Sequence, residues 1–340
     1  MPPRTRPYSR SILIAAAVTL MCASPAYSQE QQQPAGEKKI PKLNSVEMRG
    51  SGRELRPDAT NTIRVDVPLV LVNVTVTDPY GRVVTGLERE HFRVLEDKQA
   101  QEITHFSSED VPISIGVIID VSGSMSNKYD KARQAAVRFM RTANPQDEFL
   151  LVSFSERAQL ISHFTGDIET LQSRLLYTKP PKGRTALLDA VYLALSQMHG
   201  AQHSRKALLI ISDGADNHSR YNQRDIKRAV EESEVQIYAI GIYDPWSYRH
   251  SPEERWGPAL LGEITEITGG RSFTVENLND LPDIATKISL ELRNQYTIGF
   301  RPANREKDGK WRKLKVKLDP PRGLPDLHTY ARTGYYAPKP

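Results

Sequence analysis

One carboxylate and two hydroxyls alternate in the segment Asp-x-Ser-x-Ser, as Asp120, Ser122 and Ser124. They follow an apolar run that begins at Ile113 and is typical of a buried strand. At the carboxyl end of such a strand, the three side chains can all turn toward one point above the sheet. Hard oxygen donors of this kind suit Mg²⁺, which keeps several waters and takes one or two carboxylates. The segment therefore predicts a metal site.

Two later segments add oxygen donors to the same predicted edge. Thr185 stands at the start of a predicted helix, and Asp213 follows another apolar run. Ligands of parallel sheets bind beyond the carboxyl ends of the strands, so we expect all five residues to meet there. Helix capping is the alternative explanation for Asp and Ser at such positions. Capping accounts for each residue separately, whereas a metal site accounts for their shared edge.

The elements that must position these residues alternate between strands and helices. The strands are expected at 113–120, 148–154, 206–212 and 235–241, with an edge strand at 159–164 and a short one near 272. The helices are expected at 129–141, 167–176, 186–198, 225–233, 260–268 and 281–292. This alternation predicts an α/β fold with a doubly wound, mostly parallel sheet flanked by helices, over residues 111–293.

Two β segments flank that domain, at residues 62–110 and 294–340. Their strands are expected at 62–77, 92–97, 101–106, 296–300, 313–318 and 328–333. Strict alternation in the fifth of these turns Leu314, Val316 and Leu318 inward and the intervening lysines outward. Each segment is small for an independent sheet. We therefore predict that the two combine in one small β-sandwich.

The amino-terminal region has the pattern of a secretory signal peptide over residues 1–28. Three arginines precede an apolar run from Ile12 to Ala23, and Ala26-Tyr27-Ser28 forms a small-x-small cleavage site. An uncleaved anchor is the alternative, although the run is shorter than the roughly 20 residues that span a bilayer. Residues 29–61 are rich in Gln, Pro, Gly and charge, which predicts a disordered linker.

Composition excludes several classes of chemistry. Cys22 is the single cysteine and lies in the signal peptide, so the mature chain has no disulfide and no thiolate site. The net charge of +5 falls to +2 without the signal peptide, because three of the 46 basic residues and none of the 41 acidic ones lie there. Nucleic-acid-binding domains are more basic than this, so we expect no nucleic-acid partner. No further apolar run is long enough to span a membrane.

With these motifs in place, the chain resembles a von Willebrand factor type A domain with a metal-ion-dependent adhesion site. Asp120, Ser122 and Ser124 match its Asp-x-Ser-x-Ser element, Thr185 its distant threonine, and Asp213 its Asp-Gly element. The chain also resembles the narrower VWFA-related family of exported bacterial proteins. That likeness is carried by Val74-Thr-Val-Thr-Asp78, Val84-Thr-Gly-Leu87, Phe92-Arg-Val-Leu-Glu-Asp97 and Arg332-Thr-Gly-Tyr-Tyr336.

The resemblance implies a binding module whose metal, Mg²⁺ with Mn²⁺ or Ca²⁺ as alternatives, coordinates a carboxylate of a protein partner. The signal peptide places it in the periplasm or outside the cell. No His-Glu-x-x-His, Gly-x-Ser-x-Gly or phosphate-binding glycine loop is present, so we expect no enzyme. The alternatives are a hydrolase of the cell envelope and an adaptor subunit of an envelope assembly complex. The sequence leaves the ligand and the oligomeric state open.

Overall fold

The computed structural model of the chain describes residues 69–178, 183–243 and 252–340. The predicted signal peptide, the predicted linker and the first residues of the 62–77 strand lie outside these ranges. Within them, no helix is both long and apolar enough to cross a membrane. Residues Ile63–Pro340 belong to one compact unit.

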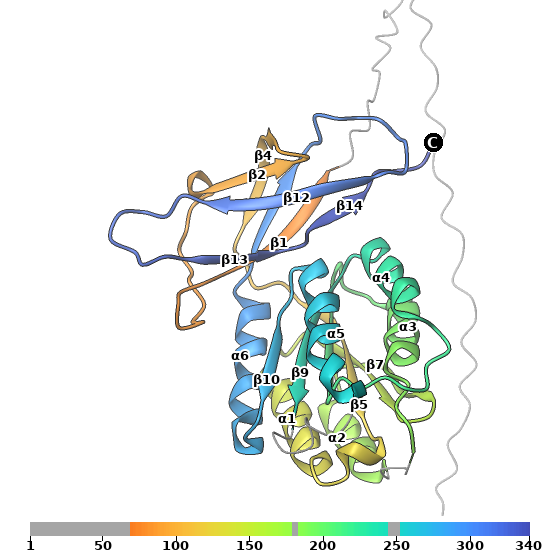
Figure 1. The fold of residues 1–340 in the computed structure, drawn as a ribbon. Helices are drawn as coiled ribbons and strands as arrows, with labels where there is room; N and C mark the ends of the chain where they lie inside the picture. The colour runs from red at the N-terminus through yellow and green to blue at the C-terminus, as the bar shows by residue number, and fades with distance from the viewer. Residues whose placement is uncertain (1–68, 179–182, 244–251) are drawn as a thin grey trace, which may run out of the picture. The chain divides into compact units, whose positions relative to one another are not determined.

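A six-stranded sheet is the centre of the α/β part, with strand order β10-β9-β8-β5-β6-β7 (Figure 1). The strands are β5 (Ile113–Asp120), β6 (Glu148–Phe154), β7 (Ala158–Thr165), β8 (Arg205–Ser212), β9 (Val235–Ile242) and β10 (Ser272–Val275). All neighbours pair in parallel except β7, which is antiparallel to β6 at one edge. Every residue of β5 and β9 is buried, because helices cover both faces of the sheet.

Six α-helices form the two outer layers. They are α1 (Tyr129–Thr142), α2 (Ile168–Tyr177), α3 (Leu187–Gln197), α4 (Gln223–Glu232), α5 (Pro252–Thr268) and α6 (Leu281–Arg293). The apolar faces of α1, α2 and α6 share one core with Ile115, Val117 and Ile119 of β5. Those of α3, α4 and α5 share a second core with Ile118 on the opposite face of the same strand. The predicted doubly wound α/β sheet is confirmed.

The flanking segments form a β-sandwich of two antiparallel four-stranded sheets, ordered β13-β1-β11-β4 and β14-β12-β2-β3. The strands are β1 (Val70–Thr77), β2 (Phe92–Glu96), β3 (Gln99–Gln101), β4 (Ile103–Ser107), β11 (Tyr296–Phe300), β12 (Trp311–Leu318), β13 (His328–Ala331) and β14 (Gly334–Tyr336). Each sheet takes strands from both segments, and a single apolar core lies between them. The predicted combination of the two segments is confirmed, and Leu314 and Val316 are buried as expected.

Several predicted boundaries are wrong. The segment 101–106 is divided at Glu102, so that β3 and β4 belong to different sheets. Helix α5 begins at Pro252 and not near 260, with Pro258 inside it. Proline disfavours a helix interior, and this misled the prediction. Strand β14 was not predicted, because three residues carry no readable periodicity.

A buried hydrogen-bond network joins the sandwich to the α/β part at Gln295, which connects α6 to β11. The Gln295 amide nitrogen donates to Thr75 Oγ1 on β1 (2.9 Å) and to Gln236 Oε1 on β9 (2.8 Å). Its carbonyl oxygen accepts from Arg205 Nη2 at 2.6 Å. Gln295 is 1% exposed, so water does not compete for these bonds.

Candidate metal site

Asp120 is the last residue of β5 and is fully buried. One carboxylate oxygen, Oδ1, accepts the backbone N–H of Ser122 at 2.9 Å. The other, Oδ2, accepts the hydroxyl of Ser212 at 2.6 Å. The parallel pairing of β5 with β8 explains this second contact, because Ile119 lies beside Ile211 and the next residues of both strands then meet. The carboxylate is therefore held from its own loop and from the neighbouring strand.

The Asp-x-Ser-x-Ser loop forms one turn of 3-10 helix, Gly123–Met125. Its two hydroxyls lie together, with Ser122 Oγ 3.1 Å from Ser124 Oγ. Met125 is fully buried in the core beneath and anchors the turn. The alternating spacing thus places both hydroxyls at one position after the strand.

Thr185 is brought to this loop by backbone contacts. The N–H of Gly123 donates to the carbonyl of Gly183 at 3.3 Å. The N–H of Thr185 donates to Asn217 Oδ1 at 2.9 Å, and its carbonyl accepts the N–H groups of Asn217 and His218. Thr185 is 3% exposed and lies between the first loop and the loop that follows β8.

Asp213 follows β8 and is also 3% exposed. Its Oδ1 accepts a long hydrogen bond of 3.4 Å from Ala215, while Oδ2 has no hydrogen-bond partner. Gly214 adopts a φ of +76°, and a Cβ there would lie 2.8 Å from the backbone of Gly257 on α5. Glycine is required at that turn, both for its left-handed conformation and for this close approach.

The two aspartates repel each other. Burial raises the pKa of Asp120 above its ordinary value, and the Asp213 carboxylate raises it further, whereas the hydrogen bonds from Ser122 and Ser212 lower it. A cation between two such carboxylates would remove the repulsion. Two carboxylates and three hydroxyls form a donor set that fits a hard divalent cation, and one of the carboxylate oxygens, Asp213 Oδ2, is buried without a hydrogen bond.

Sequence reasoning missed two residues of this site. Ser212 holds Asp120, as described above. Lys128, directly before α1, extends a buried side chain to Asp213, with 3.8 Å between Nζ and Oδ2. Neither belongs to a motif, because a strand residue and a helix-preceding lysine give no signal of what they face. Among the residues that the structure describes, no group of three or more His, Cys, Asp or Glu side chains is arranged so that it could hold a metal ion.

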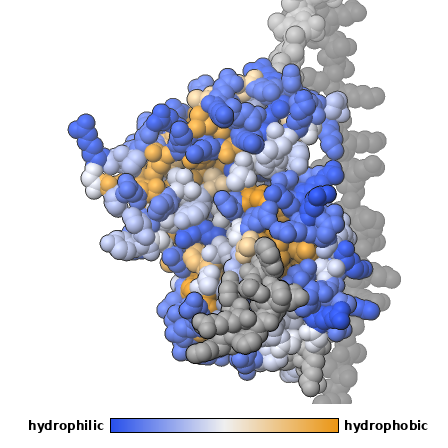
Figure 2. All heavy atoms as spheres, viewed as in Figure 1, coloured by the Kyte–Doolittle hydropathy of each residue, from blue (hydrophilic) through white to orange (hydrophobic). Residues whose placement is uncertain are grey.

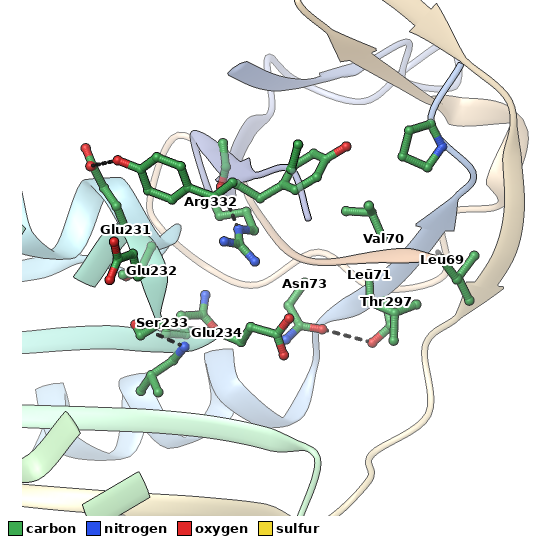
Figure 3. A pocket seen from close by; sticks show the side chains of 18 of the residues that line it. Leu69, Val70, Leu71, Asn73, Glu231, Glu232, Ser233, Glu234, Thr297 and Arg332 are labelled. Carbon is green, nitrogen blue, oxygen red and sulfur yellow. Dashed lines mark hydrogen bonds between the residues drawn. The ribbon is translucent and has the colours of Figure 1, made fainter. Parts of the chain in front are cut away.

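The structure also contains a hollow of ≈ 1110 Å³ with other lining residues (Figure 3). It is lined by Arg205 and Val235, where β8 and β9 begin, whereas Asp120 and Asp213 follow strand ends. Leu69 and Leu71 line it on one side and Glu231 on another. None of the predicted metal ligands contributes to it. The visible surface is mostly hydrophilic with small apolar patches (Figure 2).

Comparison with known proteins agrees with the predicted domain type. The family model described as the von Willebrand factor type A domain matches residues 115–215. That part of the chain is a von Willebrand factor type A domain, and the resemblance inferred from the motifs is confirmed at this level. The match ends two residues after Asp213 and therefore covers all three motif elements, namely the Asp-x-Ser-x-Ser segment, Thr185 and Asp213. The narrower resemblance to exported VWFA-related proteins stays a prediction.

Individual relatives are distant. An uncharacterized protein of Borreliella burgdorferi is 23% identical over 220 residues, covering 56% of this chain. The chain spans 63% of that protein's length. A von Willebrand factor type A structure from Catenulispora acidiphila aligns with a TM-score of 0.47 and 13% identity, covering 79% of this chain and 75% of that one. Proximal thread matrix protein 1 of the mussel byssus, described with a zinc-occupied MIDAS motif, aligns at 0.45 and 17% identity, over 58% and 49% of the two chains.

Proposed function

We propose that this protein is a metal-dependent protein-binding module and has no catalytic activity of its own. The observation that supports the proposal is the set of contacts that links the loops of Asp120, Ser122, Ser124 and Thr185. Asp213 lies close enough to Asp120 for its charge to raise the pKa of Asp120. Asp213 Oδ2, which is buried and has no hydrogen bond, is an oxygen that a bound cation would satisfy.

These five residues would hold Mg²⁺, with Mn²⁺ or Ca²⁺ as alternatives. A bound cation supplies a Lewis-acidic position that an incoming carboxylate can complete. Arg184, exposed beside Thr185, adds a positive charge at the rim. The partner that fits is therefore a protein presenting an acidic side chain. In this proposal, residues 111–293 form the domain that carries the site, and residues 62–110 and 294–340 form the β-sandwich packed beside it. We also propose that the protein is exported to the periplasm or the cell exterior.

Substitution of Asp120 by alanine tests the metal site. Isothermal titration with MnCl₂ and with MgCl₂ should give one site on the wild-type protein and no measurable binding to Asp120→Ala. The far-ultraviolet circular dichroism spectrum should be retained, because the β5 core residues are unchanged. Asp319→Ala serves as the control, since Asp319 is a half-exposed carboxylate paired with Arg93 on the sandwich. Equal binding by wild type and Asp120→Ala would contradict the proposed function.

A further inference from the structure

Lys128 carries a positive charge at a buried position where that charge is expected to lower the stability of the fold. Its side chain is 9% exposed and begins at the residue before α1, where the positive end of the helix dipole disfavours another positive charge. Burial of an ammonium group is also costly unless it is paired. The residue nevertheless turns inward, toward the edge of the sheet.

Two groups receive the ammonium. Nζ donates to the carbonyl oxygen of Ile242, at the end of β9, at 3.3 Å. It also lies 3.8 Å from Asp213 Oδ2, the carboxylate oxygen that has no hydrogen bond. Backbone bonds fix the start of the side chain, because the Lys128 N–H donates to Met125 and its carbonyl accepts from Ala132. The position of the ammonium group is thus fixed by contacts with the end of β9, with Asp213 after β8 and with the residues around the start of α1.

This third charge changes the electrostatics of the site. With Asp120 and Asp213 ionised, as metal ligands must be, the two carboxylates alone would be neutralised by a divalent cation. With Lys128 present, the metal-loaded site keeps one surplus positive charge. A single incoming carboxylate then brings the buried cluster to neutrality, which is the state of lowest desolvation cost.

We infer that Lys128 determines the ligand specificity of the site, by weakening metal binding and making the loaded site selective for an anionic partner. The inference rests on the proposed function and goes beyond it, since it assigns a role to a residue outside the five ligands. It requires that neutralising Lys128 change metal affinity and carboxylate affinity in opposite directions. A lysine that only stabilises the fold would not have this effect.

The experiment is titration of Mn²⁺ into wild type and Lys128→Met, without and with sodium acetate as the carboxylate probe. Lys128→Met should bind Mn²⁺ about tenfold more tightly, because a unit charge close to a dication is removed from a weakly screened site. Acetate should tighten Mn²⁺ binding by the wild-type protein more than Mn²⁺ binding by Lys128→Met, because the metal-loaded variant lacks the surplus positive charge. Lys128→Arg, which keeps the charge, and Lys227→Met, which removes a surface charge paired with Glu263, should both behave as wild type.

Unchanged or weaker Mn²⁺ binding by Lys128→Met, with the fold intact by circular dichroism, would overturn the inference. Lys128→Gln, which keeps an N–H donor for the Ile242 carbonyl, gives the same test if the methionine variant does not fold. If neither neutral variant folds, Lys128 is a structural counter-ion and the inference is wrong. Absence of Mn²⁺ binding by the wild type, or its persistence in Asp120→Ala, would instead contradict the proposed function itself.

Discussion

Ser212 is the residue on which the orientation of Asp120 depends most directly. Its hydroxyl donates to Asp120 Oδ2 at 2.6 Å and its oxygen accepts the N–H of Gly214 at 3.0 Å. It therefore links the carboxylate of one strand to the turn after its neighbour. Partners of this kind fix the direction of a metal ligand without touching the metal.

Ser212→Ala should weaken Mn²⁺ binding by about 10- to 100-fold, the usual cost of losing a group that orients a ligand. Isothermal titration measures the effect. Ser196→Ala is the control, because that hydroxyl donates only to the carbonyl of Leu193 on the exposed side of α3. Affinity within a factor of about two of wild type would show that Asp120 is positioned by its own loop alone.

At the scale of residues, the sequence predicts the members of the motif, but it does not predict which other side chains contact them. The five oxygen-bearing residues follow from alternate spacing and from strand ends. Ser212 and Lys128 depend on the register between β5 and β8 and on the path of a side chain across the sheet edge. Register between strands 90 residues apart is set by the whole core, and no local pattern encodes it.

Among the elements, α6 carries an unusual buried acid. Glu291 is fully buried and pairs with Arg271. Burial raises the pKa of Glu291, and the nearby charges of Arg271 and Lys287 lower it. The effect of burial is the larger, so the pKa of Glu291 is raised to about 6. The ordinary pKa is 4.5, so the folded protein holds this proton more tightly than the unfolded chain does. The stability contributed by protonated Glu291 is therefore present below pH 4.5 and is lost as pH rises through 6.

Glu291→Gln should remove this dependence. Between pH 5 and pH 7.5, the free energy of unfolding should fall by about 1 kcal/mol more in the wild type than in the variant, as the raised pKa requires. Urea denaturation at the two pH values measures it, and all other titrating groups cancel between the proteins. Parallel pH dependence in both would mean that Arg271 holds Glu291 ionised throughout.

The elements themselves were largely predictable, because strands covered on both faces are apolar throughout and helices show a 3.6-residue period. The failures have local causes. Pro258 concealed the first turns of α5, and Glu102 falls between two strands of different sheets. In each case the packing of the folded protein, and not the intrinsic secondary-structure preference of the residue, determines the local structure.

At the scale of the whole molecule, Gln295 is a buried residue whose side chain forms hydrogen bonds with both the sandwich and the α/β part. Gln295→Ala would leave Thr75, Gln236 and Arg205 each short of a hydrogen bond in a site that excludes water. At roughly 1 kcal/mol or more for each unsatisfied group, we expect a loss of about 3 kcal/mol in the free energy of unfolding.

Urea denaturation monitored by circular dichroism tests this estimate. Gln134→Ala, on the exposed face of α1, should change stability by less than about 0.5 kcal/mol. A loss below about 1 kcal/mol in Gln295→Ala would show that the hydrogen bonds of Gln295 contribute little to the stability of the contact between the two parts.

The shared construction of the sandwich also constrains when it can form. β1 pairs with β11 and β13, and β2 pairs with β12, so the amino-terminal strands wait for partners more than 200 residues later. During synthesis, at about 5–20 residues per second, β1 stays without its partners, and β2 is paired with β3 alone, for on the order of ten seconds or more. The α/β part, whose strands all lie between, is complete before the ribosome reaches β12. Unpaired strand edges in that interval are open to wrong pairing, so correct assembly of the sandwich depends on strands β11 to β14, which are synthesised last among its strands.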